Sequence, residues 1–497
     1  MGAMNSRHAL WLPLLLVGGA CGDNHKPSAA ASAMEIFGGN GQGGAPSNAL
    51  HDSLRVKVKD ETGNPVSGVM VAWSVVSGGG TVSPSSSATN SDGVAATQFT
   101  LGLTEGEQRA QAQVGGLAGS PAVFTEIATT SPTQVNLRVV AGGNNVPERY
   151  SSDLWVHGNY AYTGTWGLRD QQGNLLKIWS LDASGAPTLV NSLIVNDVGT
   201  VSDVQVTDDG QTLVLSGEVG DSGGIFVYGL SDPAHPVRQG FATVGLRGIH
   251  TVSLSTIGGR LYAFAAMNPG FSGDATEDKP ALMIYDITDR FNPALARREP
   301  IEPHYGIHDT YVRDGIAFVF AWDEGVIIYD VGNGMRGGSP LAPVKISQLI
   351  TSARGATSPS VHNGWWFHNP VSGEARYLFI GQEGPANIGV SSSGDIHVVD
   401  VLDLAHPREV AFFHLGGAGT HNFWVDEEKQ VLYAAYYNAG VIALDISGTL
   451  SGNLSDRLLS QVKPGGPSNT FTWGVQLANG SLYAIDMESG LWQLKTE

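Results

Sequence analysis

The sequence is poor in the residues on which several classes of protein depend. A single cysteine among 497 residues excludes a disulfide within the chain. Lys and Arg number 27 against 46 Asp and Glu, which gives a formal net charge of −19, and the basic residues form no cluster. Such acidity repels nucleic-acid backbones and anionic headgroups, so we expect no nucleic-acid partner and no membrane contact through charge.

Long stretches with a 3.6-residue apolar period are also missing. Instead, 66 glycines interrupt short apolar runs rich in Val, Ile, Tyr, Phe and Trp. This pattern is typical of an all-β protein. Because the chain is too long for one ordinary core, we expect at least two domains.

The N-terminus resembles a bacterial lipoprotein signal peptide. Arg7 supplies positive charge, and residues 9–17 form an apolar run too short to span a bilayer. Small residues then precede Cys21, as in the lipobox, although Gly18 stands where leucine is usual. The resemblance implies export and a lipid anchor on Cys21, in the outer membrane or at the cell surface. The alternative is an ordinary signal peptide followed by an incidental cysteine.

Residues 41–130 have the pattern of a small β-sandwich. Short alternating strands are separated by turn dipeptides such as Asn64-Pro65 and Asp92-Gly93. The stretches VKDETGNPVSGVMVAWSVVSGGGTV and TNSDGVAATQFTLG closely resemble the bacterial immunoglobulin-like domain of invasins and intimins. Members of that family usually act as rigid spacers, so the resemblance implies a stalk. The small, polar residues of 21–40 predict a flexible tether before it.

A unit of roughly fifty to sixty residues recurs from residue 131 to residue 497. Four short strands per unit are typical of propeller blades, and counting third strands predicts a seven-bladed β-propeller. The last unit stops at its third strand, so we expect Thr133–Val140 to supply the fourth strand and close the ring. The third strands are LLKIWSLD, GIFVYGLSD, ALMIYDITD, GVIIYDVG, DIHVVDVLD, GVIALDIS and GLWQLK.

The third-strand motif, an apolar run that ends in Asp before a Pro turn, resembles the LVIVD-repeat family of bacterial surface and secreted propellers. The nearest matches are ALMIYDITDRFNP, DIHVVDVLDLAHP and GVIALDIS. The resemblance implies a fold and no particular activity. The expected architecture is all-β: a signal peptide (1–20), a tether (21–40), an immunoglobulin-like β-sandwich (41–130) and a seven-bladed propeller (131–497) closed by its N-terminal strand.

Four consecutive blades carry a histidine at one place. Because first strands line the channel of a propeller, these histidines are expected to ring one mouth, near the long loops Asn268–Pro280 and Glu383–Gly394. Asp309, Asn363 and Asn422 follow three of them. Stepping back four positions from the last apolar residue of each first strand gives Ser152, Ser202, His250, His308, His362, His421 and Trp473.

Converging imidazoles would suit iron, copper, zinc or nickel, which makes His250, His308, His362 and His421 candidate metal ligands. Alternatively, each His-Asp or His-Asn pair ties a blade to its neighbour by hydrogen bonds. Aromatic side chains offer a second candidate surface for a glycan or apolar ligand, or else ordinary blade packing. They are Trp155, Trp365, Trp366, Trp424 and Trp473.

Two functions follow from these patterns. The preferred one is a surface binding or adhesion protein whose propeller face docks a protein, glycan or small molecule. The other is a metal-dependent extracytoplasmic enzyme, an oxidoreductase or lyase, that uses the four histidines. The sequence contains no nucleophile elbow, phosphate loop or zinc-protease motif.

Overall fold

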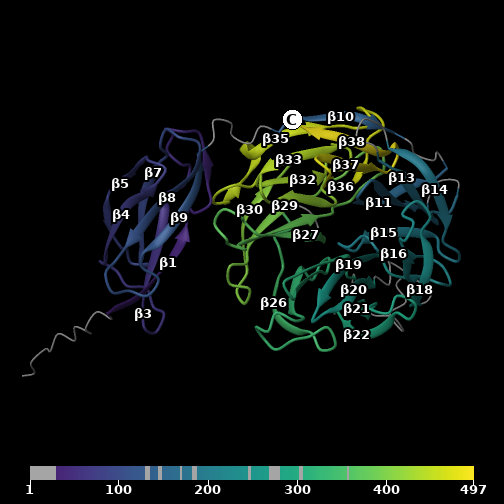
Figure 1. Cartoon of the computed structure of the whole chain (residues 1–497), viewed down its shortest axis with the longest axis horizontal. Helices are drawn as coiled ribbons and strands as arrows, with labels where there is room; N and C mark the ends of the chain where they lie inside the picture. Colours follow the sequence, from purple (N-terminus) through teal and green to yellow (C-terminus); the bar gives the residue numbers. More distant parts are fainter. Residues whose placement is uncertain are drawn as a thin grey trace, which may run out of the picture.

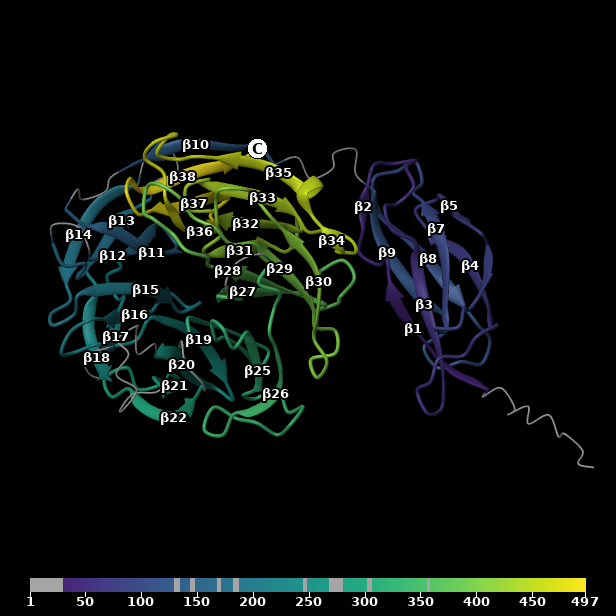
Figure 2. The ribbon, with the colours of Figure 1, turned by 180° about the vertical axis from the view of Figure 1, so that it is seen from behind.

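A computed structural model describes residues 30–128, 135–143, 148–167, 171–181, 187–244, 248–267, 280–301, 306–354 and 358–497. The chain forms a small sandwich and a large ring of sheets, side by side (Figures 1 and 2). The expected all-β class is confirmed, since the described ranges contain only one short 3-10 turn, η1 (Ser455–Arg457), besides strands. Cys21 and the signal sequence lie outside the described residues.

The sandwich consists of two sheets, with strand orders β1-β3-β7-β5 and β2-β9-β8-β4-β6. Its strands alternate as expected for half-buried sheets: in β3, Leu54, Val56 and Val58 are buried and pack against Trp73 and Phe124. The strands are β1 (Ala31–Gly38), β2 (Gly43–Gly44), β3 (Leu54–Asp60), β4 (Met70–Ser77), β5 (Thr81–Ser83), β6 (Ser86–Ala88), β7 (Val94–Thr100), β8 (Gly106–Gln113) and β9 (Ala122–Ala128).

The expected flexible tether over 21–40 is wrong for its second half. Ala31–Gly38 forms β1, which pairs antiparallel with β3 and places Met34 opposite Val58. Met34 is buried in the core of the sandwich, and burial of this side chain favours the ordered strand. The sandwich therefore begins ten residues before the expected boundary at 41.

In the described residues the ring consists of seven sheets, one per blade, each built on four antiparallel strands; blades 1 to 4 use four consecutive strands, and the outer strand of blade 7 comes from before blade 1. Apolar clusters fill each interface between neighbouring blades, so the core of the ring is divided among its seams. The strands of blades 1 to 3 are β11 (Tyr150–His157), β12 (Tyr160–Trp166), β13 (Leu175–Ser180), β14 (Thr188–Ile194), β15 (Thr200–Val206), β16 (Thr212–Glu218), β17 (Gly224–Gly229), β18 (Val237–Thr243), β19 (Thr251–Ile257), β20 (Arg260–Met267), β21 (Ala281–Asp286) and β22 (Ala294–Pro300).

Blade 5 has an additional two-residue strand, which pairs parallel with its outer strand β30. The remaining strands, in blades 4 to 7, are β23 (Asp309–Arg313), β24 (Ile316–Phe320), β25 (Val326–Asp330), β26 (Val344–Leu349), β27 (Val361–Phe367), β28 (Tyr377–Gln382), β29 (Ile396–Asp400), β30 (Arg408–Phe413), β31 (Phe423–Asp426), β32 (Val431–Ala435), β33 (Val441–Asp445), β34 (Gly452–Asn453), β35 (Leu458–Val462), β36 (Thr472–Ala478), β37 (Ser481–Asp486) and β38 (Gly490–Thr496).

The ring closes as expected. The segment that precedes blade 1 forms β10 (Leu137–Gly142), which lies antiparallel to β38 and completes blade 7, with Val139 opposite Leu494. Both strands lie together at the rim beside the C-terminus in Figure 1. Pairing satisfies the backbone groups that an open edge at β38 would leave exposed. Thr133 and Gln134 of the expected strand lie outside the described residues.

Among the described residues, three hydrogen bonds join the sandwich to blades 5 and 6. Gly39 N–H donates to Thr449 Oγ1 (3.2 Å), and Thr449 N–H donates to Asp52 Oδ2 (3.2 Å). Arg376 Nη1 donates to the carbonyl of Phe37 (3.2 Å). Thr449 follows a third strand and Arg376 precedes a second strand, so both lie on the face of the ring that holds these turns.

Shortening one side chain of β10 tests the contribution of the closing strand. Leu137 is 6% exposed and packs in the cluster between blades 6 and 7. We expect Leu137→Ala to lower the free energy of unfolding of the propeller by about 2–5 kcal/mol, measured by urea denaturation, with the sandwich transition unchanged. Arg138→Ala is the control, because Arg138 makes only an exposed ion pair with Glu497 (3.6 Å). Equal effects of the two changes would contradict a structural role for β10.

Candidate functional site

The four histidines lie where four innermost strands begin. His362 belongs to β27. His250 and His308 immediately precede β19 and β23, and His421 lies two residues before β31. The backbone N–H of His250 donates to Ala266 O, that of His308 to Phe320 O and that of His421 to Ala435 O, each at 2.8 Å. These equivalent bonds to the second strands hold the histidines of different blades at one level of the channel.

The imidazole rings form a continuous arc. Ring centroids are 4.1 Å apart for His250 and His308, 4.0 Å for His308 and His362, and 4.1 Å for His362 and His421. Trp473 extends the arc at 4.0 Å from His421, and Trp166 lies 5.2 Å from Trp473 and 6.4 Å from His250. The sequence prediction that the histidines converge at one mouth therefore agrees with this arrangement.

The outer two histidines are held through Nδ1. His250 Nδ1 lies 2.9 Å from Glu218 Oε1, and His421 Nδ1 donates to the carbonyl of Trp473 at 2.6 Å. The second bond ties blade 6 to blade 7, as the alternative interpretation of the histidines expects. Four buried ring nitrogens of these histidines have no hydrogen-bond partner in the described chain: Nδ1 of His308, both nitrogens of His362 and Nε2 of His421.

A carboxylate joins the central pair of histidines. Glu383 follows β28, and its Oε2 lies 3.5 Å from His308 Nε2 and 3.7 Å from His362 Nε2. Its Oε1 accepts a hydrogen bond from the hydroxyl of Tyr437. One nitrogen of each of the two histidines and one carboxylate oxygen lie within 4.8 Å of one another. Among the described residues, this group has the composition and spacing of a metal site.

Burial sets the protonation of three of the four histidines. It lowers the pKa of His308 and His421 well below the ordinary value, with His362 adding to the effect, and lowers the pKa of His362 to about 3. All three are therefore neutral at pH 7, the form in which imidazole binds metal ions. Burial acts in the same direction on His250, but the Glu218 carboxylate outweighs it and raises the pKa. Burial also raises the pKa of Glu383.

Carboxyl and amide groups form the next layer of the channel. Asn422 Nδ2 donates to Asp153 Oδ2 at 2.8 Å, which connects blades 6 and 1, and Asp203 Oδ2 accepts the N–H of Val252 at 2.7 Å. Burial, reinforced by Asp203, raises the pKa of Asp309 to about 7.

Asn363 is also buried, and its Oδ1 has no hydrogen-bond partner in the described chain. Asp309, Asn363 and Asn422 therefore line the channel one residue beyond the histidines of their own strands.

The tryptophans do not form one surface. Trp365 and Trp424, with centroids 5.1 Å apart, lie three residues further along their strands than the histidines, roughly 10 Å at about 3.3 Å per residue. Trp155 packs against Trp424 there. Trp366 points the other way, because successive strand residues alternate, and packs against Phe318 between blades. Trp473 lies at the histidine mouth, so the five tryptophans occupy separate places. Trp366 packs between blades, as the alternative expects, and ligand binding by the others stays a prediction.

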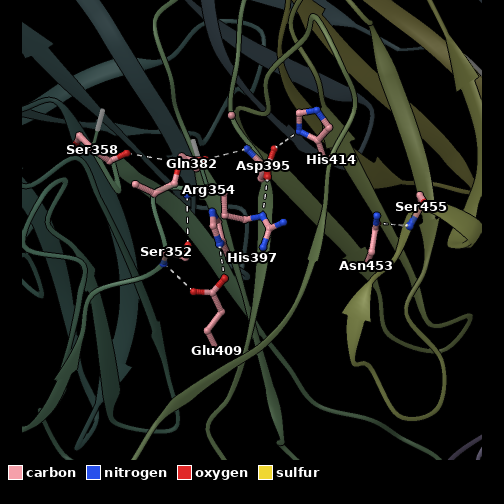
Figure 3. Close-up of polar contacts among 12 residues, drawn as sticks. Ser352, Arg354, Ser358, Gln382, Asp395, His397, Glu409, His414, Asn453 and Ser455 are labelled. Atoms are coloured by element: carbon pink, nitrogen blue, oxygen red, sulfur yellow. Dashed lines mark hydrogen bonds and ion pairs between the residues drawn. The ribbon is translucent and has the colours of Figure 1, made fainter. Parts of the chain in front are cut away.

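A polar network in blade 5 holds the segment that leads to His362 (Figure 3). Gln382 Nε2 donates to the carbonyls of Ala353 (3.2 Å) and Ser358 (3.1 Å), and Glu383 N–H donates to Ser360 O (3.0 Å). Further bonds in the network are Arg354–Asp395, His414–Asp395, His397–Glu409 and Ser352–Glu409. The network fixes the backbone before His362 and the backbone of Glu383.

Several residues of the site were not predicted from the sequence. Glu218, Glu383 and Tyr437 lie at the ends of second strands or in the turns after them, and each stands six residues after the first residue of its second strand. This shared spacing was one available signal, and the long loop Glu383–Gly394, which begins with the carboxylate itself, was another. The other long loop lies outside the described residues over 268–279.

The histidine mouth and the sandwich lie on opposite faces of the ring. In an antiparallel blade, the turns between first and second strands and those after third strands share one end, and the loops after second strands lie at the other. Arg376 and Thr449, which contact the sandwich, belong to the first set. Glu383 and Tyr437 belong to the second. The mouth therefore faces away from the contact with the sandwich.

Replacing one buried channel carboxyl should change the pH dependence of stability. Burial raises the pKa of Asp203 to about 6, so the native state binds more protons than the unfolded state between about pH 4 and 6, and ionised Asp203 destabilises it above that range. Asp203→Asn should leave the free energy of unfolding unchanged at pH 4 and raise it by about 2–3 kcal/mol at pH 7.5, at 1.36 kcal/mol per pKa unit. Urea denaturation at the two pH values measures this difference. Asp209→Asn, in an exposed turn, should give no gain. An increase in the free energy of unfolding that does not depend on pH would contradict a raised pKa of Asp203.

Comparison with known proteins identifies the sandwich. Residues 45–127 match the model of the bacterial Ig-like domain (group 1). No curated protein matches the chain. In the described residues, no helix is long and apolar enough to cross a membrane. Bacterial Ig-like domains are typical of extracellular and surface proteins, and the sandwich at residues 45–127 is such a domain.

Proposed function

We propose that this protein is an exported surface protein whose propeller binds a transition-metal ion at the channel mouth, with His308, His362 and Glu383 as ligands and His421 beside them. The observation that carries the proposal is the cluster of two imidazoles and one carboxylate within 4.8 Å, next to buried ring nitrogens without partners. Unpartnered buried polar atoms are uncommon, and each costs about 1–3 kcal/mol.

A bound cation would offset this cost. It would accept the lone pairs of neutral imidazoles and neutralise Glu383 in a place where burial disfavours its charge. Two imidazoles and a carboxylate suit iron, copper, zinc or nickel and leave coordination positions open. Open positions support catalysis, so the chemistry fits the metal-dependent oxidoreductase or lyase of the second sequence hypothesis.

The Ig-like domain favours a second candidate, a binding or adhesion protein. Its contact with the turn face leaves the mouth directed outward, where a protein, glycan or small molecule could dock without a metal. The metal content of the purified protein distinguishes the two candidates. A surface that only docks a ligand does not require neutral histidines whose ring nitrogens lack hydrogen-bond partners.

Metal analysis of the full chain, purified without an affinity tag, tests the proposal. We expect about one equivalent of a transition metal per chain, lost in His362→Ala and in Glu383→Gln because each removes a ligand from a site with three. His235→Ala is the matched control, since His235 is exposed and pairs only with Asp232. A native chain that stays free of metal after equilibration with Fe²⁺, Zn²⁺, Cu²⁺ and Ni²⁺ would refute the metal centre.

Membrane attachment is tested at Cys21. If the cysteine carries a lipid, Cys21→Ser abolishes lipidation, and the expressed protein moves from the detergent phase to the aqueous phase in detergent partitioning. The control is Ser28→Ala, which alters the same segment without touching the thiol. Equal partitioning of the Cys21→Ser and parent proteins would contradict a lipid anchor.

A further inference from the structure

One turn of blade 6 holds the loop that begins with Glu383. Tyr436, Tyr437 and Asn438 are consecutive and lie between β32 and β33. The Tyr436 hydroxyl donates to the carbonyl of Gly394 (3.0 Å), and the Tyr437 hydroxyl donates to Glu383 Oε1. Asn438 Oδ1 accepts from Ser392 Oγ. Three neighbouring side chains therefore hold both ends of the loop 383–394.

Of these contacts, the one made by Tyr437 determines where the carboxylate points. Glu383 has two carboxylate oxygens: Tyr437 bonds Oε1, and Oε2 lies toward His308 and His362. A glutamate without such a bond has several rotamers to lose when it binds an ion. With Oε1 held, the side chain is already oriented for the ion that the proposed metal centre would bind.

Tyr437 is itself held rigidly. It is 1% exposed, and its ring lies 4.5 Å from Phe471 and 5.2 Å from His421. Its φ of +39° is unfavourable for a tyrosine, and backbone strain of this kind is concentrated at functional sites.

Trp322, in the corresponding turn of blade 4, has a φ of +52° and stacks on His308 at 5.0 Å. Two blades thus use the same strained turn to place an aromatic ring against a histidine of the arc.

We infer that Tyr437 is a positioning residue of the metal centre, which acts by fixing Glu383 Oε1 so that Oε2 faces His308 and His362. The inference rests on the proposed metal centre and adds to it a residue that touches no ion. Its effect on metal binding therefore passes entirely through Glu383.

The test is a double-mutant cycle on the full chain, with Co²⁺ as the probe. Tyr437→Phe removes one oxygen and should weaken Co²⁺ binding about 10–100-fold, the usual effect of losing a group that orients a ligand. Glu383→Gln should weaken it at least as much. Adding Tyr437→Phe to Glu383→Gln should cost nothing more, because the residue through which Tyr437 acts is already gone. The visible absorption of bound Co²⁺ should change in both single variants.

Tyr436→Phe is the matched control. It removes a buried tyrosine hydroxyl and one hydrogen bond next to the same loop, yet Tyr436 does not touch Glu383. Co²⁺ affinity should stay within about 2-fold of the parent, and the melting temperatures of the two metal-free Tyr variants should be similar. Unchanged affinity in Tyr437→Phe, or an additive loss in the double variant, would overturn the role of Tyr437 and leave the metal centre intact. A parent chain that binds no Co²⁺, Fe²⁺ or Zn²⁺ would overturn both.

Discussion

Convergence of seven innermost strands on one axis is the constraint on which the site depends. Each first strand begins at the same face, and its pairing with the second strand fixes the level of every residue along the channel. A residue type repeated at one strand position therefore becomes a ring of side chains, although the residues are far apart in sequence. The histidine arc results from this geometry, with neighbouring centroids 4.0–4.1 Å apart.

The elements that repeat could be predicted from the sequence. Third strands recur in all blades, which indicated the propeller, and the incomplete last blade indicated that a strand from before the first blade closes it. The level of the four histidines followed from aligning first strands. Glu383 and Tyr437 share one position, six residues after the start of their second strands, but the residue type at that position varies among the blades, so no single repeated residue marks it.

Two further differences have simple physical causes. Trp365 and Trp366 are adjacent, so only one of them can face the channel, and a composition-based grouping of tryptophans ignores that alternation. The segment Ala31–Gly38 is composed mainly of small and polar residues, which resemble a linker, yet Met34 is buried in the sandwich core, Ile36 packs against that core, and the segment pairs with β3 as an edge strand.

The position of the seam has a consequence for how the ring can open. The ends of the propeller meet only in blade 7, where Asn136 N–H donates to the carbonyl of Glu497 at 2.5 Å. His308, His362 and Glu383 lie in blades 4 and 5, within one uninterrupted stretch of chain. β10 and β38 are joined by strand pairing and not by a turn of the chain, because β10 precedes blade 1 and β38 follows blade 6 in sequence. Separation of β10 from β38 would therefore break no strand pairing in the blades that hold these three groups, so the ring could open at blade 7 without moving them apart.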